Sequence, residues 1–241
     1  MKSEQANLTT AGSGKEGYNR RKFLSALGLG TAGAAVLSSC GHNDWYDQFR
    51  DGNKNGGATL DFKDDIGILN YAYALEQLEA AFYTEVVAKS SSVFSASQNA
   101  FFNDIKLHEI AHREFFKKAL GSNAIGNLEV DFSSVNFSSK DSVLATAKAF
   151  EDLGVAAYNG AGYKIMTEAY LVIAGQIVSV EARHAAWIRD QISNGSFSDL
   201  NSLTALGADN SKGLDAALPP SKVLPIAATY IKTKIDVKNV F

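Results

Sequence analysis

The chain has 241 residues, of which 46% are hydrophobic and 20% charged, with a formal net charge of -3 at pH 7. This composition allows a sizeable core, which excludes wholesale disorder, and the charge gives no sign of a nucleic-acid partner. Cys40 is the single cysteine, which excludes an internal disulfide. A metal site would therefore depend on His, Asp and Glu side chains.

The N-terminal residues have the order of an export signal. Arg20 and Arg21 are followed by a lysine and then by two bulky apolar residues, an order that resembles a twin-arginine signal. Asn19, however, stands where Ser or Thr is more usual. The alternative is a plain apolar helix that follows an arginine pair by chance. Residues 23–37 are apolar but too short for a transmembrane helix, which needs about 20 apolar residues.

Small residues then precede Cys40, as in a bacterial lipoprotein cleavage box. We expect residues 1–39 to be removed and Cys40 to carry lipid, so that the twin-arginine machinery exports the chain. The mature protein would be a periplasmic or cell-envelope lipoprotein anchored to a membrane, and the sequence does not say to which one. Residues 40–60 are rich in Gly, Asn and Asp, which indicates a flexible tether, and His42 in this segment is set aside.

Four later segments have apolar residues at spacings of three and four, which predicts helices over roughly 64–88, 97–120, 141–160 and 167–193. Residues 121–140, between the second and third helices, are too many for a tight hairpin and suit a crossover along a bundle. The sequence therefore predicts an all-α fold, a four-helix bundle over residues 61–195. Residues 196–241, which contain Pro219, Pro220 and Pro225, would pack on it as an extension.

Two of the predicted helices carry a glutamate three residues before a histidine. Glu109 precedes His112 in the second helix, and Glu181 precedes His184 in the fourth. Residues at this spacing share one helix face, so each pair presents a carboxylate and an imidazole to the same place. A two-metal site in a helix bundle uses this spacing twice, with one further carboxylate from each of the other two helices.

The first and third helices supply those carboxylates and reveal an internal repeat. Aligned on Glu76 and Glu151, both helices have Leu at +2, Ala at +5 and Tyr at +7. Glu79 also lies on the inward face, but its counterpart in the repeat is Gly154, which cannot bind a metal. Glu76 is therefore the preferred ligand, and Glu79 an additional or neighbouring group.

Four carboxylates with two imidazoles suit two ions of iron or manganese, which would react with O2 or peroxide. Tyr83 and Tyr158, two turns beyond Glu76 and Glu151, would donate hydrogen bonds or electrons to the site, or else are tyrosines of the core. His108 has no glutamate three residues before it, so we expect it to be peripheral. A metal-free structural bundle is the alternative for the whole set, at the expense of six buried polar groups.

These residues lie in four blocks, 75–83, 108–116, 150–158 and 180–187, that in this order resemble the ferritin-like family of bacterial exported and plant desiccation-related proteins. The chain is also distantly similar to manganese catalases and bacterioferritins. The resemblance implies a ferritin-like fold with a carboxylate-bridged dimetal centre, mapped onto Glu76, Glu109, His112, Glu151, Glu181 and His184.

Three functions stay open at this stage. The first is an exported redox enzyme acting on O2 or peroxide, and the second is a metal-binding or iron-storage protein. The third is a stress or desiccation-related structural protein in which a metal only stabilises the fold, or is absent. The sequence does not choose between iron and manganese, and it leaves open whether identical chains associate.

Overall fold

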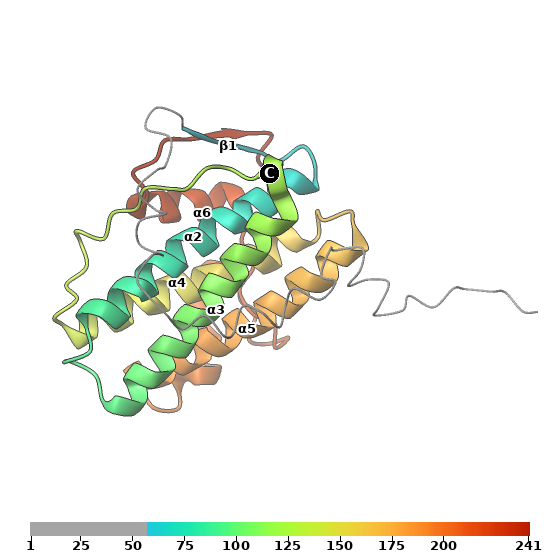
Figure 1. The fold of residues 1–241 in the computed structure, drawn as a ribbon. Helices are drawn as coiled ribbons and strands as arrows, with labels where there is room; N and C mark the ends of the chain where they lie inside the picture. Colours follow the sequence, from blue (N-terminus) through green and yellow to red (C-terminus); the bar gives the residue numbers. More distant parts are fainter. Residues whose placement is uncertain (1–56) are drawn as a thin grey trace, which may run out of the picture. The chain divides into compact units, whose positions relative to one another are not determined.

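The computed structural model describes residues 57–241, which form a helix bundle with one two-stranded sheet (Figure 1). The helices and strands are, in chain order, β1 (Ala58–Asp61), α2 (Asp65–Lys89), α3 (Ala96–Leu120), α4 (Lys140–Gly162), α5 (Glu168–Ile192), α6 (Pro220–Ala227) and β2 (Ile235–Lys238). Short 3-10 helices lie at η4 (Gly121–Asn123), η5 (Ser196–Ser198), η6 (Asn201–Leu206) and η7 (Ala228–Tyr230). Within this part of the chain, no helix has both the length and the hydropathy needed to cross a membrane. The export signal and lipidation predicted at Arg20, Arg21 and Cys40 lie outside the described residues.

The four long helices begin and end within two residues of their predicted bounds, because local capping residues fix their termini. The side chain of Asp64 accepts a hydrogen bond from the backbone N–H of Gly67 at the start of α2. Ser95 and Gln98 form a reciprocal capping box at the start of α3. Gly121 follows α3 with a φ of 53°, a conformation that glycine adopts at little cost.

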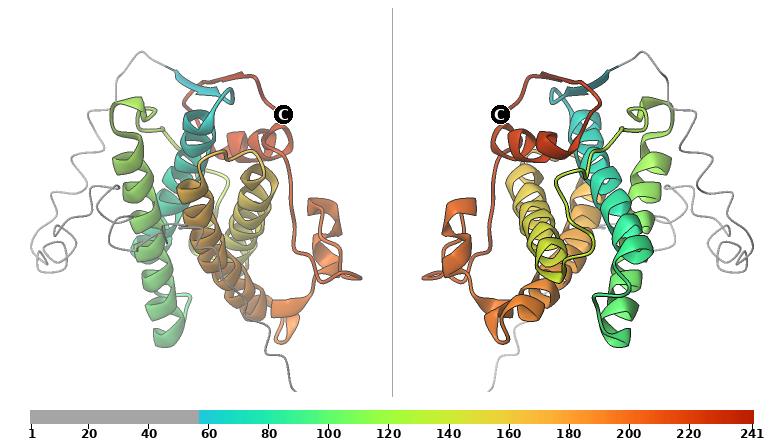
Figure 2. Two further views of the ribbon diagram at one scale, coloured as in Figure 1. Left: turned by 90° about the vertical axis from the view of Figure 1, so that its right-hand side faces the viewer. Right: turned by 90° about the vertical axis from the view of Figure 1, so that its left-hand side faces the viewer.

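The bundle consists of two helix pairs. α2 packs along α3, α4 packs along α5, and α2 and α4 join the pairs (Figure 2). These pairs are the two halves of the internal repeat. Aromatic rings fill the space between α2, α4 and the crossover, where Phe82 contacts Phe132, Phe137 and Phe150.

Two buried amides on α2 hold the long crossover against the bundle. Asn70 accepts a hydrogen bond from the N–H of Ile125 (2.7 Å), and Gln77 accepts one from the N–H of Leu128 (2.8 Å). The residues are seven apart, so their side chains lie on the same face of α2, two turns from each other. They satisfy backbone groups of a segment that has little regular structure of its own.

The residues after α5 run back along the bundle and end in a strand (Figure 2). β2 pairs in parallel with β1, with Ala58 opposite Ile235 and Leu60 opposite Val237. The last residues of the predicted tether are therefore part of the fold, which corrects the boundary drawn at residue 60. Leu60 is fully buried, and its strand partner is far away in sequence, so no local pattern indicated this pairing.

A buried ion pair fastens the start of this extension to α4 and α5. The guanidinium of Arg189 donates to both carboxylate oxygens of Asp152 (2.8 and 2.9 Å), and also to the carbonyl of Asp199 and the hydroxyl of Ser202. Arg189 and Asp152 are 4% and 3% exposed, so the pair is shielded from solvent. Bidentate arginine pairing of this kind is geometrically specific, which fixes where η5 and η6 lie.

Gly160 and Gly175 test how closely the extension packs on α4. A Cβ at Gly160 would lie 1.8 Å from the carbonyl oxygen of Leu218, whereas one at Gly175, on an exposed face of α5, would meet nothing within 4 Å. We predict that Gly160→Ala lowers the free energy of unfolding by about 1–3 kcal/mol, the usual effect of overpacking. Gly175→Ala should leave it unchanged or raise it by up to about 1 kcal/mol, since alanine favours helix. Denaturant unfolding measures both, and equal stability of the two variants would contradict the close packing at Leu218.

Candidate metal centre

Glutamate side chains gather in the middle of the bundle, away from solvent. Glu76, Glu109, Glu151 and Glu181 are 0% exposed, and Glu79 is 3% exposed. Carboxylates are rarely buried unless they are paired or bound to a metal, because losing water strongly disfavours their charged form. The centre therefore requires protons, cations or both.

Each long helix contributes to this cluster through its own spacing. Glu109 and His112 lie one turn apart on α3, and Glu181 and His184 do so on α5. Glu76 on α2 and Glu151 on α4 stand at matching positions of the repeat. The structure thus brings together all six residues that the sequence analysis proposed as ligands.

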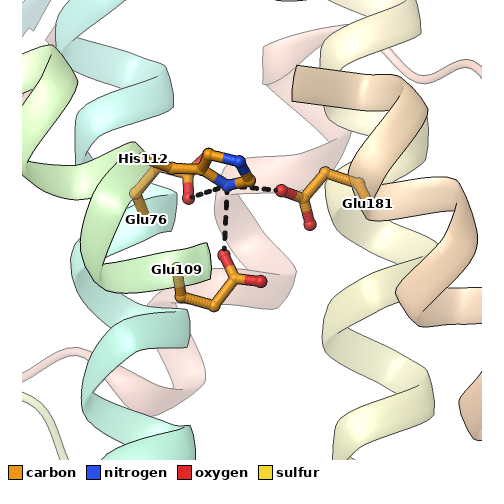
Figure 3. Close-up of side chains that lie close together, drawn as sticks. All are labelled: Glu76, Glu109, His112 and Glu181. Atoms are coloured by element: carbon orange, nitrogen blue, oxygen red, sulfur yellow. Dashed lines mark ion pairs between the residues drawn. The ribbon is translucent and has the colours of Figure 1, made fainter. Parts of the chain in front are cut away.

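One half of the centre surrounds His112 (Figure 3). Its Nδ1 atom lies 2.9 Å from Glu181 Oε1, 3.4 Å from Glu76 Oε2 and 3.6 Å from Glu109 Oε2. The four side chains come from α2, α3 and α5, and their donor atoms lie within 4.8 Å of one another. Such a group could hold a metal ion.

The other half has the same arrangement around His184. Its Nδ1 atom lies 2.9 Å from Glu109 Oε1, 3.4 Å from Glu151 Oε2 and 3.6 Å from Glu181 Oε2. Glu109 and Glu181 belong to both groups, each through a different oxygen in its contacts with the two imidazoles. The two halves are related by an approximate two-fold, as the sequence repeat predicts.

The atoms that face one another here fit a metal better than they fit hydrogen bonds. Among the described residues, eleven buried side-chain polar atoms have no hydrogen-bond partner, and eight of them are in this centre. They are Glu76 Oε2, both oxygens of Glu109, Glu151 Oε2, both oxygens of Glu181, and Nδ1 of His112 and His184. The imidazole nitrogens are thus near enough to the carboxylates for ion pairing but not aligned with them. Lone pairs that converge without hydrogen bonds are the arrangement that a bound ion satisfies.

A tyrosine hydroxyl binds each of the two glutamates, Glu76 and Glu151, that belong to only one group of four. The hydroxyl of Tyr83, on α2, donates a hydrogen bond to Glu151 Oε1 on α4, and that of Tyr158, on α4, donates to Glu76 Oε1 on α2. Each tyrosine therefore serves the glutamate of the opposite helix rather than its own. This leaves one oxygen of each glutamate, Oε2, facing the centre.

The pKa shifts follow from burial and from the crowding of like charges. Burial raises the pKa of Glu79 well above its usual range, and the carboxylates of Glu181 and Glu109 raise it further. Burial also raises the pKa of Glu151 to about 7, although His184 opposes this. Burial acts in the same direction on Glu181, but the two nearby imidazoles outweigh it and lower its pKa to about 2. Glu79 therefore favours its neutral, protonated form, and Glu181 its charged form.

Glu79 is close to the centre but belongs to neither group of four. A Cβ at Gly154 would lie 3.0 Å from Glu79 Oε1, so the glycine leaves the space that this carboxyl group occupies. Glu79 and Gly154 occupy equivalent positions of the repeat and complement each other: one helix supplies the side chain, and the other leaves room for it.

His108 is the residue that sequence reasoning undervalued. We expected it to be peripheral, and its side chain is indeed exposed. Its Nδ1 atom nevertheless lies 2.9 Å from Nε2 of His184, on the side of that ring away from the carboxylates. The available signal was the break in the repeat, since the position equivalent to His108 in α5 is Val180.

A mainly apolar cavity borders the centre on the side of Tyr158. Its walls come from all four long helices and include Ile68, Leu75, Phe116, Ala157, Tyr158 and Ile173. Since the hydroxyl of Tyr158 is bound to Glu76, the cavity reaches a residue in direct contact with the candidate ligands. Walls of this kind suit a small uncharged molecule.

Comparison with known proteins agrees with this geometry. A family model described as a ferritin-like domain matches residues 64–194, from the cap of α2 to just beyond α5. The matched segment includes all four long helices and the six side chains of the two groups. No curated protein matches the chain significantly. By its helix order, its paired Glu-x-x-His spacing and this match, the chain belongs to the ferritin-like domain family.

Proposed function

We propose that this protein is an exported ferritin-like oxidoreductase whose bundle holds two ions of iron or manganese and acts on O2 or hydrogen peroxide. One observation carries the proposal: two groups of four donors that share Glu109 and Glu181. Shared carboxylates that use a different oxygen toward each group are suited to bridging two ions. Glu76 with His112, and Glu151 with His184, would complete the two sets.

Charge balance supports two divalent ions. Four ionised glutamates carry a charge of -4, which two divalent cations with neutral imidazoles would cancel, given that Glu79 favours its protonated form. A single divalent ion would leave two buried negative charges without compensation, which is very unfavourable in a low dielectric.

The ligand types favour iron or manganese. Each ion would have carboxylate oxygens and one imidazole as ligands, and no thiolate. Such a set of hard and borderline ligands suits iron and manganese. Two such ions, when bound, supply the exchange of electrons with O2 or peroxide. The protein's own residues position the reaction: Tyr83 and Tyr158 fix the carboxylates of Glu151 and Glu76, and burial excludes bulk water. The apolar cavity beside Tyr158 would admit a small uncharged molecule.

Export belongs to the same proposal and rests on the sequence of residues 1–40. The twin-arginine route carries folded proteins, so metal would be loaded before export, where the cell controls which ion is offered. We predict that Cys40→Ser moves the protein from the membrane fraction to the soluble fraction of the cell envelope. Unchanged membrane association would contradict a lipid anchor at Cys40. The double variant Arg20→Lys/Arg21→Lys is the matched test of the export signal.

The ligand assignment predicts how many ions each variant keeps. Wild-type protein should contain about two ions of Fe or Mn per chain, and Glu109→Ala should lose both because Glu109 belongs to both groups. Glu76→Ala removes a ligand of the His112 group alone, so it should keep about one ion. Elemental mass spectrometry of the purified mature chain measures this. The control is Glu129→Ala in the exposed crossover, and two ions retained in Glu109→Ala would show the assignment to be wrong.

Peroxide turnover separates the proposed enzyme from the other functions. On the same sample, the redox proposal predicts that two molecules of H2O2 give O2 and two of water, or that O2 is consumed with an added electron donor. The activity should disappear in Glu109→Ala and persist in Glu129→Ala. Two ions bound without either activity would contradict the enzyme. A closed many-subunit assembly that accumulates iron would then favour storage, and a small inert assembly a structural role in stress or desiccation.

A further inference from the structure

The two halves of the centre differ behind their imidazoles. Nε2 of His184 is 2.9 Å from Nδ1 of His108. Within residues 57–241, the structure records no side-chain hydrogen bond to Nε2 of His112. On the carboxylate side the two halves match, since both Nδ1 atoms have neighbours at 2.9, 3.4 and 3.6 Å. The asymmetry therefore arises outside the ligand groups.

The His108–His184 contact has the geometry of a direct hydrogen bond. The ring planes are only 8° apart and the ring centroids are separated by 5.2 Å. At that separation, a 2.9 Å distance between ring nitrogens requires both nitrogens to point along the line joining the rings. The imidazoles thus meet edge to edge rather than face to face, with an N–H bond of one aimed at the lone pair of the other.

The site decides which nitrogen carries the proton. Nδ1 of His184 faces Glu109, Glu151 and Glu181, so it must offer a free lone pair to bind an ion there. The proton of a neutral His184 then lies on Nε2 and is donated to Nδ1 of His108. His108 in turn carries its own proton on Nε2, and its side chain is exposed to solvent.

The sequence repeat shows that this contact belongs to one half alone. His108 directly precedes Glu109 on α3, while Val180 directly precedes Glu181 on α5. A valine side chain cannot accept a hydrogen bond, so it cannot provide His112 with the support that His108 gives His184.

We propose that His108 is a positioning residue that makes the two metal positions unequal. By accepting the Nε2 proton, it fixes the tautomer and orientation of His184 and increases the basicity of Nδ1. The ion held by Glu109, Glu151, Glu181 and His184 is therefore bound more tightly than the ion held with Glu76 and His112. This inference rests on the proposed two-metal function and adds an order of binding to it.

A calorimetric titration, in which Mn²⁺ alone is added to the metal-free mature protein, tests the inference. Wild-type protein should show two binding events of different affinity. His108→Leu should weaken the tighter event by about 10–100-fold, the usual effect of removing such a hydrogen-bond partner, and leave the weaker event unchanged. His108→Asn should restore most of the affinity, because its amide oxygen can accept the same proton.

Val180→Ala is the matched control at the equivalent position of the other half and should alter neither event. His108 is exposed, so both His108 variants should retain the wild-type helical circular dichroism. Two events in wild type with an unchanged tighter event in His108→Leu would overturn the inference and leave the proposed function standing. Equal weakening of both events, or no rescue by His108→Asn, would also overturn it. A wild-type chain that binds no Mn²⁺ in this titration, and holds no divalent metal by elemental mass spectrometry after purification, would overturn the proposed function and the inference with it.

Discussion

Four fully buried carboxylates face one another across the middle of the bundle, and like charges repel strongly where the dielectric constant is low. Two protonated imidazoles would balance only two of these four negative charges. Two divalent cations would relieve the repulsion fully and leave the imidazoles neutral as ligands. The rest of the fold keeps these six side chains in place.

The supporting interactions come from the same rigid elements as the ligands. Tyr83 and Tyr158 each reach across to a glutamate on the opposite helix, so that α2 and α4 hold each other's glutamate in position. Asn70 and Gln77 fasten the crossover to α2, and Arg189 fastens the C-terminal extension to α4 and α5. A site built on packed helices with ligands fixed by neighbouring hydrogen bonds is preorganised for metal binding.

Two departures from the internal repeat make the centre asymmetric. Glu79 has Gly154 as its counterpart, and His108 has Val180. The first adds a buried carboxyl group next to Gly154 at the edge of the centre, and the second places a histidine behind one imidazole. A repeat that gives two equal ligand sets would thus provide two unequal positions, as expected where two ions have different parts in one reaction.

Much of the fold, and the meeting of the six candidate ligands, could be predicted because the relevant signals are local. Helical periodicity and capping residues such as Asp64 and Ser95 fix the helices, and the Glu-x-x-His spacing puts ligand pairs on one face. The pairing of β1 with β2, the exchange of tyrosines between α2 and α4, and the contact of His108 with His184 could not. Each depends on how distant segments pack, and single residues such as His108 carry no periodic pattern that would reveal their partners. The repeat compensated in part, since it favoured Glu76 over Glu79 as a candidate ligand, and Glu76 lies in one of the two groups of four while Glu79 lies in neither.

The central claim is that this acidic cluster is a two-metal site, and anomalous X-ray diffraction from crystals of natively exported protein tests it most directly. Data collected on both sides of the iron and manganese absorption edges would identify each ion by element and place it among the side chains. The account predicts two anomalous peaks, one beside His112 and one beside His184, with Glu109 and Glu181 lying between them. The absence of any peak, in a bundle whose glutamates are instead hydrogen-bonded to one another through retained protons, would contradict it.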